Sequence, residues 1–448
     1  MNASERTTTA MKAKASTGSV RTGDRPWSSR GRWIQPKMTD TTEAAGATAS
    51  SGGGPLDGVR VLDLSNLLAG PMTTMYLADF GADVVKVERP GAGDELRKWG
   101  HHKGNVPLMF KLVNRNKRLI TLDLHQKEGQ AIARELMLRS DVVVESFRPG
   151  TLKRWGLGYE ELRREKPELI MASITGFGQR GPYANRRGFG SIGEAMSGFA
   201  YVTGEPAGPP LLPTFGLGDT TTAIFSAYGI LLALWNAKVR GGGGQHVDAA
   251  LYEGLVTLLG AHIVDYDQLG IVQERTGSRL PFAAPRNCYR TRDEKWIVLA
   301  GSTQRAFRAI AEALSSPELA TDPRFATNTL RLANVEDLDL AIQERVARFT
   351  FAELSTRLEE ADAPAFPIYS VDDLVHDPHV IARQNVAQVK DDELGRLRMQ
   401  NVIPRLERTP GRISWPGLSP GAHNDEVYRG ELRLSGKRLA VLRDKGVI

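Results

Sequence analysis

The chain of 448 residues has a single cysteine, Cys288. One thiol cannot form an internal disulfide, and zinc sites built on several cysteines are excluded as well. The paired histidines of a helical zinc motif and the glycine-lysine loop that cradles phosphates are also missing. We therefore expect no bound metal and no redox chemistry. Scarce cysteine fits a reducing compartment, so we expect a cytoplasmic protein.

Long hydrophobic runs are equally scarce. The longest apolar segments, such as residues 230–235, are short and interrupted, whereas a membrane-crossing helix needs about 18 or more apolar residues in succession. Hydrophobic residues make up 41% of the chain and charged residues 25%, which is typical of globular proteins. We expect a soluble protein without a membrane partner. Because single cores stop growing near about 250–300 residues, we also expect more than one domain.

The net charge of +6 is concentrated in residues 1–37, which hold eight cations against two anions; the rest of the chain is neutral. A nucleic-acid site needs a basic patch on the folded part, so no nucleic-acid partner is expected. Residues 1–54 are rich in serine, threonine, alanine and glycine and predict a disordered N-terminal extension. The alternative, a transit peptide over residues 1–37, would place the protein in an organellar matrix.

From residue 55 onward, short β-rich runs alternate with segments of helical periodicity. The expected strands cover residues 59–64, 83–88, 141–145 and 169–174. The expected helices cover residues 72–80, 127–139, 152–166, 220–238 and about 247–269. This alternation predicts βαβ units, and therefore an α/β fold with a parallel sheet covered by helices.

A smaller α+β unit is expected to begin near Cys288. Two β-rich runs flank the charged turn at residues 293–295 and predict a hairpin. Its strands would cover residues 288–292 and 296–300, followed by helices over 304–314, 334–349 and 351–360 and an extended run over 363–369. After residue 371 the chain is loop-rich, with a last helix over 439–445.

One glycine-rich segment matches a dinucleotide-binding pattern by letter only. Gly176, Gly178 and Gly181 have the spacing of that motif. The motif requires its last glycine to open a helix that holds the pyrophosphate. Here a proline and further turn residues follow, at positions 182–185. Nicotinamide binding is therefore not expected.

Asp219 follows two glycines, Gly216 and Gly218, and precedes an apolar helix. One interpretation is structural, because aspartate is a preferred N-cap that satisfies free backbone N–H groups. The other is catalytic: the glycines would let another molecule approach, and the aspartate would be a covalent nucleophile kept ionised by the helix dipole. The local sequence leaves both open.

A set of basic residues accompanies the predicted strands: Lys86, Arg89, Arg97, Arg115, Lys117, Arg118, Arg154 and Arg187. Surface charge explains any one of them. Ligands of parallel sheets nevertheless bind beyond the carboxyl ends of the strands, and arginines there suit phosphate groups. A phosphate-rich ligand is therefore expected.

Taken together, the blocks in this sequence resemble the class III coenzyme A transferases, the CaiB/BaiF family. The blocks cover residues 55–63, 69–71, 81–90, 114–118, 141–150, 173–178, 181–182 and 218–219. The resemblance implies a large Rossmann-like domain with a parallel sheet, a small α+β domain, and a homodimer of interlocked rings. The implied boundaries are an extension over 1–54, a large CoA-binding domain over 55–255, a linker and small domain over 256–375, and a returning C-terminal segment over 376–448.

The resemblance also implies the chemistry. Asp219 matches the family's nucleophile, which would carry CoA from an acyl-CoA donor to a free carboxylic acid through covalent intermediates. CoA would enter as a thioester substrate, with no tightly bound cofactor. The matching CoA-contacting positions are Asn66, Leu67, Leu68, Ala69, Arg89, Leu122, Ser146, Phe147, Arg154, Arg187 and Leu251.

Departures from the family pattern leave alternatives open. Some members have histidine, glutamine and asparagine where this chain has Asn66, Leu68 and Ser146. The related α-methylacyl-CoA racemases place a proton-moving histidine where this chain has Phe189, which disfavours racemisation. The sequence as a whole is closer to the dicarboxylate-type transferases that use succinyl-CoA. In such an enzyme, Arg187, Arg286 or Arg292 would pair with the second carboxylate of the substrate. A racemase-like isomerase and a non-catalytic acyl-CoA-binding protein remain the alternatives.

Overall fold

The computed structural model describes residues 53–448. The expected N-terminal extension and transit peptide lie outside these residues, apart from the last two positions of the extension, 53 and 54.

Six parallel strands form the main sheet, in the order β5-β2-β1-β6-β7-β8. They are β1 (Arg60–Asp63), β2 (Asp83–Glu88), β5 (Lys117–Thr121), β6 (Val142–Glu145), β7 (Ile170–Thr175) and β8 (His246–Ala250). The four predicted strands and their parallel arrangement are confirmed. Strand β5 was not predicted, because it opens with two cations. The predicted helix over about residues 247–269 was wrong, since His246–Ala250 pairs with β7 as the edge strand and the remainder forms two short helices, Glu253–Leu258 and His262–Leu269.

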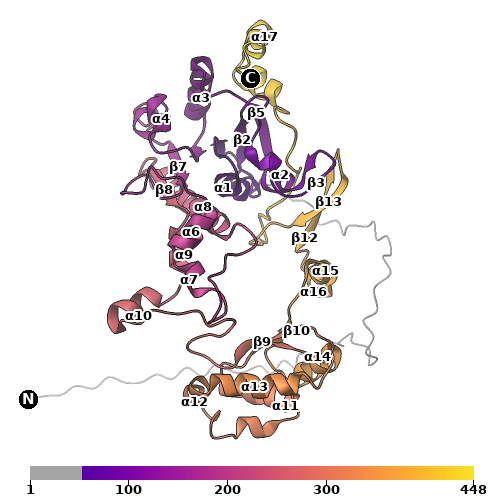
Figure 1. The fold of residues 1–448 in the computed structure, drawn as a ribbon. Coiled ribbons are helices and arrows are strands. Elements are labelled where there is room, and N and C mark those ends of the chain that lie inside the picture. Colours follow the sequence, from indigo (N-terminus) through magenta and orange to yellow (C-terminus); the bar gives the residue numbers. More distant parts are fainter. Residues whose placement is uncertain (1–52) are drawn as a thin grey trace, which may run out of the picture. The chain divides into compact units, whose positions relative to one another are not determined.

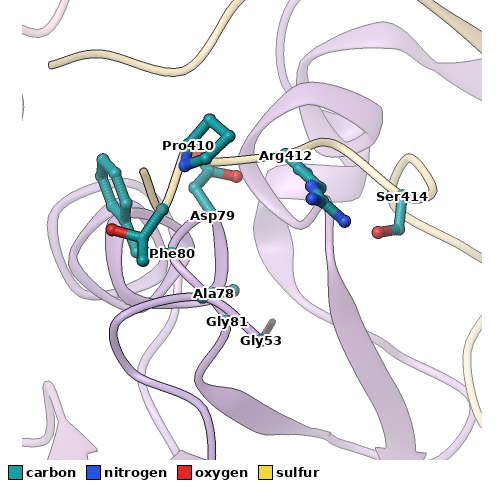
Figure 2. A pocket seen from close by; sticks show the side chains of 10 residues that line it. Gly53, Ala78, Asp79, Phe80, Gly81, Pro410, Arg412 and Ser414 are labelled. Atoms are coloured by element: carbon teal, nitrogen blue, oxygen red, sulfur yellow. The ribbon is translucent and has the colours of Figure 1, made fainter. Parts of the chain in front are cut away.

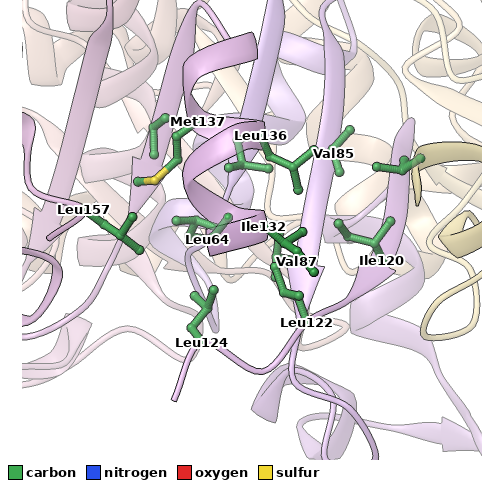
Figure 3. Packing of buried hydrophobic residues seen from close by; sticks show 14 of the residues in the cluster. Leu64, Val85, Val87, Ile120, Leu122, Leu124, Ile132, Leu136, Met137 and Leu157 are labelled. Atoms are coloured by element: carbon green, nitrogen blue, oxygen red, sulfur yellow. The ribbon is translucent and has the colours of Figure 1, made fainter. Parts of the chain in front are cut away.

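Helices cover both faces of this sheet (Figure 1). On one face α3 (Lys127–Arg139) packs Ile132, Leu136 and Met137 against sheet residues such as Val85 and Ile120 (Figure 3). On the other face lie α1 (Ala69–Ala78) and α8 (Leu217–Lys238). Each fully buried aliphatic side chain contributes about 1.5–3 kcal/mol, so these two clusters hold the layers together.

The predicted helix over residues 152–166 is broken in two. Its parts are α4 (Thr151–Arg154) and α5 (Tyr159–Leu162). Gly156 lies between them with a φ of +72°, a left-handed conformation that interrupts a helix and that glycine adopts readily.

The smaller unit has its own antiparallel sheet and core. Strand β9 (Arg286–Arg290) pairs with β10 (Trp296–Ala300), which also pairs with β11 (Ala365–Pro367), so the predicted hairpin is confirmed. Its helices are α11 (Gln304–Ala313), α12 (Asn328–Ala333), α13 (Val335–Val346) and α14 (Phe351–Glu360). Phe307, Phe325 and Leu338 lie at the centre of its core and are fully buried.

The chain after residue 370 holds more structure than expected. Short helices α15 (Val371–His376) and α16 (Pro378–Ala382) precede a hairpin of β12 (Val386–Asp391) and β13 (Gly395–Gln400). The chain then packs against β5, where the Tyr428 hydroxyl donates to the Thr121 carbonyl at 2.6 Å. The final helix, α17 (Gly436–Asp444), lies on the β5 side of the sheet (Figure 1). These contacts agree with a returning segment, while the exact domain boundaries stay a prediction.

Helix α8 corrects one expectation from the sequence. It has 22 residues, and by length and hydropathy alone it is apolar enough to cross a membrane. Half of its most apolar 18-residue window is buried inside the protein, and it packs on α1, β7 and β8. A core helix of a folded domain has these same properties.

Candidate active site

Asp219 is the third residue of α8, not its N-cap as one interpretation of the sequence had it. The N-cap is Gly216, which has no side chain of its own to cap this helix end. Glycine at position 190, which opens α6 (Gly190–Met196), makes room for the carboxylate, because a Cβ there would stand 2.1 Å from Asp219 Oδ2. A Cβ at Gly216 would stand 3.2 Å from the same oxygen. The two glycines therefore leave the carboxylate unobstructed by neighbouring side chains.

The electrostatic surroundings of Asp219 raise its pKa to about 6. Burial is the main cause, and the negative charge of Glu194 adds to it. The backbone N–H groups of Ala69 and of Asp219 itself favour the ionised form but are outweighed. The carboxylate is therefore ionised for the most part at neutral pH, as expected, but its pKa is raised and not lowered, because burial and Glu194 outweigh the helix start.

The loop after β1 lies next to this helix start. It carries the predicted positions Asn66 to Ala69, and the Asn66 N–H donates to the Ser146 hydroxyl at 3.0 Å. Leu68 reaches Gly216, where an added Cβ would lie 3.1 Å from Leu68 Cδ1. The structure thus brings the loops after β1 and β6 together, and it brings the first of them to the nucleophile.

A buried network of charges holds that loop. The Lys86 ammonium lies 2.9 Å from Asp94 Oδ2 and donates to the Ser65 carbonyl, while Asp94 Oδ1 accepts from the Leu67 N–H at 3.0 Å. Leu67 has a φ of +66°, a strained conformation for a leucine. The hydrogen bond from its N–H therefore helps to fix a turn that the backbone would otherwise avoid.

Asp63, at the end of β1, anchors the same network. The Lys117 ammonium lies 3.1 Å from its Oδ2, and the Thr74 hydroxyl donates to the same oxygen at 2.6 Å. Burial opposes its ionisation, but Lys86, Lys117 and the hydroxyl donors lower its pKa to about 2. Asp63 is therefore a permanent anion that ties β1 to β5 and α1.

Phe147 and Arg154 follow β6 along the chain. The Phe147 ring packs edge-on against Trp155, with 5.4 Å between ring centroids, and the Arg154 guanidinium donates to the Thr151 hydroxyl at 2.9 Å. Leu122 and Leu251 are buried in the cores on opposite faces of the sheet. Any contact that these two leucines make with a ligand is therefore made by their backbone atoms.

The basic residues divide into two groups. Within residues 53–448, no carboxylate lies within 4.0 Å of the guanidinium groups of Arg89, Arg154 or Arg187, all of which are exposed. The other basic residues form ion pairs with carboxylates of the protein. Lys86 and Lys117 pair with Asp63 and Asp94, Arg97 with Glu88, Arg115 with Asp79, and Arg118 with Asp83, Glu426 and Glu431. The three free arginines are also the three that the family resemblance selects.

The two arginines of the smaller unit are engaged locally. Arg286 Nη1 donates to the Ser278 carbonyl at 2.6 Å, and Arg292 pairs with Glu353 at 3.1 Å. Neither is committed to a buried ion pair, so both stay predictions for a second carboxylate.

A family model described as CoA-transferase family III matches residues 56–424. The chain belongs to this family. A succinyl-CoA–D-citramalate CoA-transferase of Chloroflexus aurantiacus is 46% identical over 88% of this chain and 98% of that protein. A succinyl-CoA:glutarate CoA-transferase of Mus musculus is 34% identical over 88% of this chain and 90% of its own.

The solved structures agree with the family. A CaiB/BaiF family protein of Brucella suis has a TM-score of 0.76 at 33% identity, over 85% of this chain and all of that one. The fold expected from the sequence is confirmed, and so is the activity class: this family III CoA-transferase moves CoA from an acyl-CoA to a carboxylic acid.

Two other features of the CoA-transferase are separate from this site. The segment with the dinucleotide-like spacing is a turn, in which Gly178 and Gly181 have positive φ. The next helix along the chain begins only at Gly190, so no helix opens at Gly181. A cavity of about 130 Å³ is lined by residues such as Phe80, Pro410 and Arg412 (Figure 2). It lies at the end of α1, beside the amino ends of the strands, whereas the site residues follow the carboxyl ends.

Sequence reasoning missed Glu194 and Asp94. Glu194 sits in a short helix without a distinctive motif. Asp94 follows Gly93 within a stretch that reads as loop, and its partner Lys86 was counted as a ligand-binding cation. Only three-dimensional proximity reveals their roles.

Proposed function

We propose that Asp219 is the covalent nucleophile of this CoA-transferase. An oxygen of its carboxylate would attack the thioester carbonyl, the C–S bond would break, and CoA thiolate would leave behind a mixed anhydride. The thiolate would then attack the Asp219 carbonyl and release the donor acid as a carboxylate, which leaves an aspartyl thioester. The acceptor carboxylate would reverse both steps. The observation that supports this most is the partly open Asp219 carboxylate between two glycines at a helix start.

We propose that CoA lies along the carboxyl ends of the strands. Arg89, Arg154 and Arg187 are exposed and have no carboxylate partner in the described part of the chain, so they are available for its phosphate groups through charge-assisted hydrogen bonds. The Phe147 ring offers an apolar wall, and the turn from Asn66 to Ala69 would follow the pantetheine arm toward Asp219. Backbone N–H groups, including that of Ala69, would stabilise the oxyanion that forms during attack.

Succinyl-CoA is the proposed donor. The curated relatives in Chloroflexus and mouse are named for succinyl-CoA together with D-citramalate or glutarate, and each of these acids carries two carboxylates. A dicarboxylic acceptor follows from the same comparison. Arg187, Arg286 and Arg292 are the candidates to pair with its second carboxylate.

We also propose a homodimer of interlocked chains. Helix α8 exposes an apolar face that includes Tyr228 and Trp235, whose exposed fractions are 57% and 61%. Helix α10 (His262–Leu269) adds Ile263, Val264, Tyr266 and Leu269. Exposed apolar surfaces of this kind mark protein interfaces, and a second copy of the chain would bury them.

The test compares the wild type with Asp219→Asn and Asp219→Ala. Each protein is incubated with succinyl-CoA or acetyl-CoA and a panel of mono- and dicarboxylic acids, and all acyl-CoA products are measured by mass spectrometry. Removing the nucleophile should lower transfer at least 10³-fold, while Asp219→Asn, which conserves shape, should retain CoA binding. Full transfer by Asp219→Asn would refute the nucleophile.

The same incubations in D₂O test the alternatives. Deuterium at the α-carbon without exchange of CoA would indicate a racemase-like isomerase instead. Binding of acyl-CoA without any product from the wild type would indicate a non-catalytic binding protein.

A further inference from the structure

A second carboxylate stands beside Asp219, and the transfer chemistry does not consume it. Glu194, on α6, is only 3% exposed, and its Oε1 accepts a hydrogen bond from the Gly218 N–H at 3.0 Å. Within residues 53–448, no lysine, arginine or histidine nitrogen lies within 4.0 Å of its carboxylate. A buried carboxylate without a cation is costly, so its presence here has a local reason.

The amide that Glu194 occupies belongs to the first turn of α8. Gly216 is the N-cap, Gly218 the second helical residue and Asp219 the third. A carboxylate at the third position is ordinarily stabilised as an anion by the free amides and the dipole of the helix start. Because Glu194 takes the Gly218 N–H and brings a second negative charge to the same end, the helix start stabilises the Asp219 anion less than it would alone.

Other charged groups on the elements packed against α8 are engaged elsewhere. Helix α1 has no charged residue and β7 has none. In α9 (Glu253–Leu258), Glu253 accepts from the Ala250 N–H. In β8, His246 bonds to the Ser173 hydroxyl, and Asp248 accepts from the Gln179 N–H. Glu194 is therefore the charge with a direct influence on the nucleophile, which also agrees with the raised pKa of Asp219.

We propose that Glu194 is a positioning residue that keeps Asp219 a basic nucleophile and fixes the turn that carries it. The inference rests on the proposed role of Asp219 and deepens it. The hydrogen bond to Gly218 holds the first turn of α8, and repulsion between the two carboxylates raises the basicity of the attacking oxygen. Within one reaction, a more basic nucleophile attacks faster once it is ionised.

The experiment separates the charge of Glu194 from its hydrogen bond. In Glu194→Gln the side-chain oxygen still accepts from Gly218, but the charge is gone; in Glu194→Asp the charge stays, but the side chain is shorter. Glu135→Gln, on α3 at the other face of the sheet, is the matched control. For each variant, kcat/KM for succinyl-CoA is measured from pH 4.5 to 9.

For Glu194→Gln we expect the acid-side midpoint of the kcat/KM profile to fall by about one pH unit, because a less basic Asp219 carboxylate ionises at a lower pH. The plateau value of kcat/KM should fall severalfold, because a less basic carboxylate attacks more slowly. For Glu194→Asp we expect the midpoint of the wild type with a lower plateau, because the bond to Gly218 is weakened. The control should follow the wild type. Equal midpoints for the wild type and Glu194→Gln would overturn the proposal.

A second readout needs no transfer activity. A water-soluble carbodiimide with glycinamide labels protonated carboxyl groups, and peptide mass spectrometry follows the labelling of Asp219 against pH. We expect the same downward shift of the midpoint in Glu194→Gln and none in Glu194→Asp, and the opposite pattern would overturn the proposal. If the labelling midpoint shifts while the wild type transfers no CoA, the proposed function fails and the coupling of the two carboxylates stands.

Discussion

Asp219 and Asp63 show how neighbours decide what an aspartate does. Both have little contact with water, which by itself opposes ionisation. Asp63 is flanked by Lys86 and Lys117, and its pKa falls to about 2. Among residues 53–448 no cation pairs with Asp219, so burial and the nearby Glu194 raise its pKa to about 6. The first side chain is a fixed structural anion, and the second is a carboxylate whose basicity is available for chemistry.

The structural role of Asp63 predicts an effect on stability. Its folded pKa lies below the value of 3.8 for a free aspartate, so its contribution is complete above about pH 4 and is lost as the pH falls toward 2. Asp63→Asn should lower the free energy of unfolding at pH 7 by about 3–5 kcal/mol, because it leaves the buried Lys117 without its paired carboxylate and removes a second anion from beside Lys86. Urea unfolding at one protein concentration measures this.

The half-exposed Asp83, which pairs with Arg118, provides the control for that measurement. Asp83→Asn should cost about 1 kcal/mol or less, since exposed ion pairs contribute little. The difference in the free energy of unfolding between the wild type and Asp63→Asn should become smaller as the pH falls from 4 to 2. A difference that stays constant over this range would contradict the low pKa of Asp63.

At the scale of elements, the sequence was informative wherever periodicity was complete. The predicted bounds of β2, α3 and α14 match the structure residue for residue. Strand β8 has only five residues and an exposed, alternating pattern, and it was mistaken for helix. The family resemblance predicted which loops carry the site residues. Neither periodicity nor motif could show that Asp94 accepts from the Leu67 N–H or that Glu194 accepts from the Gly218 N–H, because these hydrogen bonds join segments distant in the sequence.

The short helix α4 leads to a prediction about CoA binding. Arg154, at its end, is exposed, and no carboxylate within residues 53–448 pairs with it, so its guanidinium is available for a phosphate. Arg154→Ala should raise KM for succinyl-CoA about tenfold, the loss expected for one charge-assisted hydrogen bond, and leave kcat within about twofold. Initial rates over a range of succinyl-CoA concentrations separate the two constants.

Arg134 on α3 is the matched control, because it is similarly placed on the surface but pairs with Glu165. Arg134→Ala should leave KM unchanged. If Arg154→Ala lowers kcat and leaves KM as it was, Arg154 acts in the reaction and not in binding CoA.

At the scale of the whole molecule, one side of α8 presents a row of exposed apolar side chains. The buried half of that helix packs on the sheet, and the other half carries exposed aromatic and aliphatic side chains. The proposed homodimer would account for both the hydropathy of α8 and its exposed face. If the two chains interlock as proposed, each would bury this face of the other, and folding and assembly should be coupled.

A charge introduced on this face tests the dimer. The wild type should have a mass near twice 49.0 kDa in analytical ultracentrifugation, and its urea midpoint should rise with protein concentration, because association stabilises the folded state. Trp235→Glu should give the monomer mass or insoluble protein, since a buried unpaired carboxylate at an interface is strongly unfavourable. Leu340→Glu, at an equally exposed position on α13, should leave the mass unchanged. A wild type that sediments as a monomer, with a urea midpoint independent of concentration, would refute the dimer and leave the apolar face of α8 for a different partner.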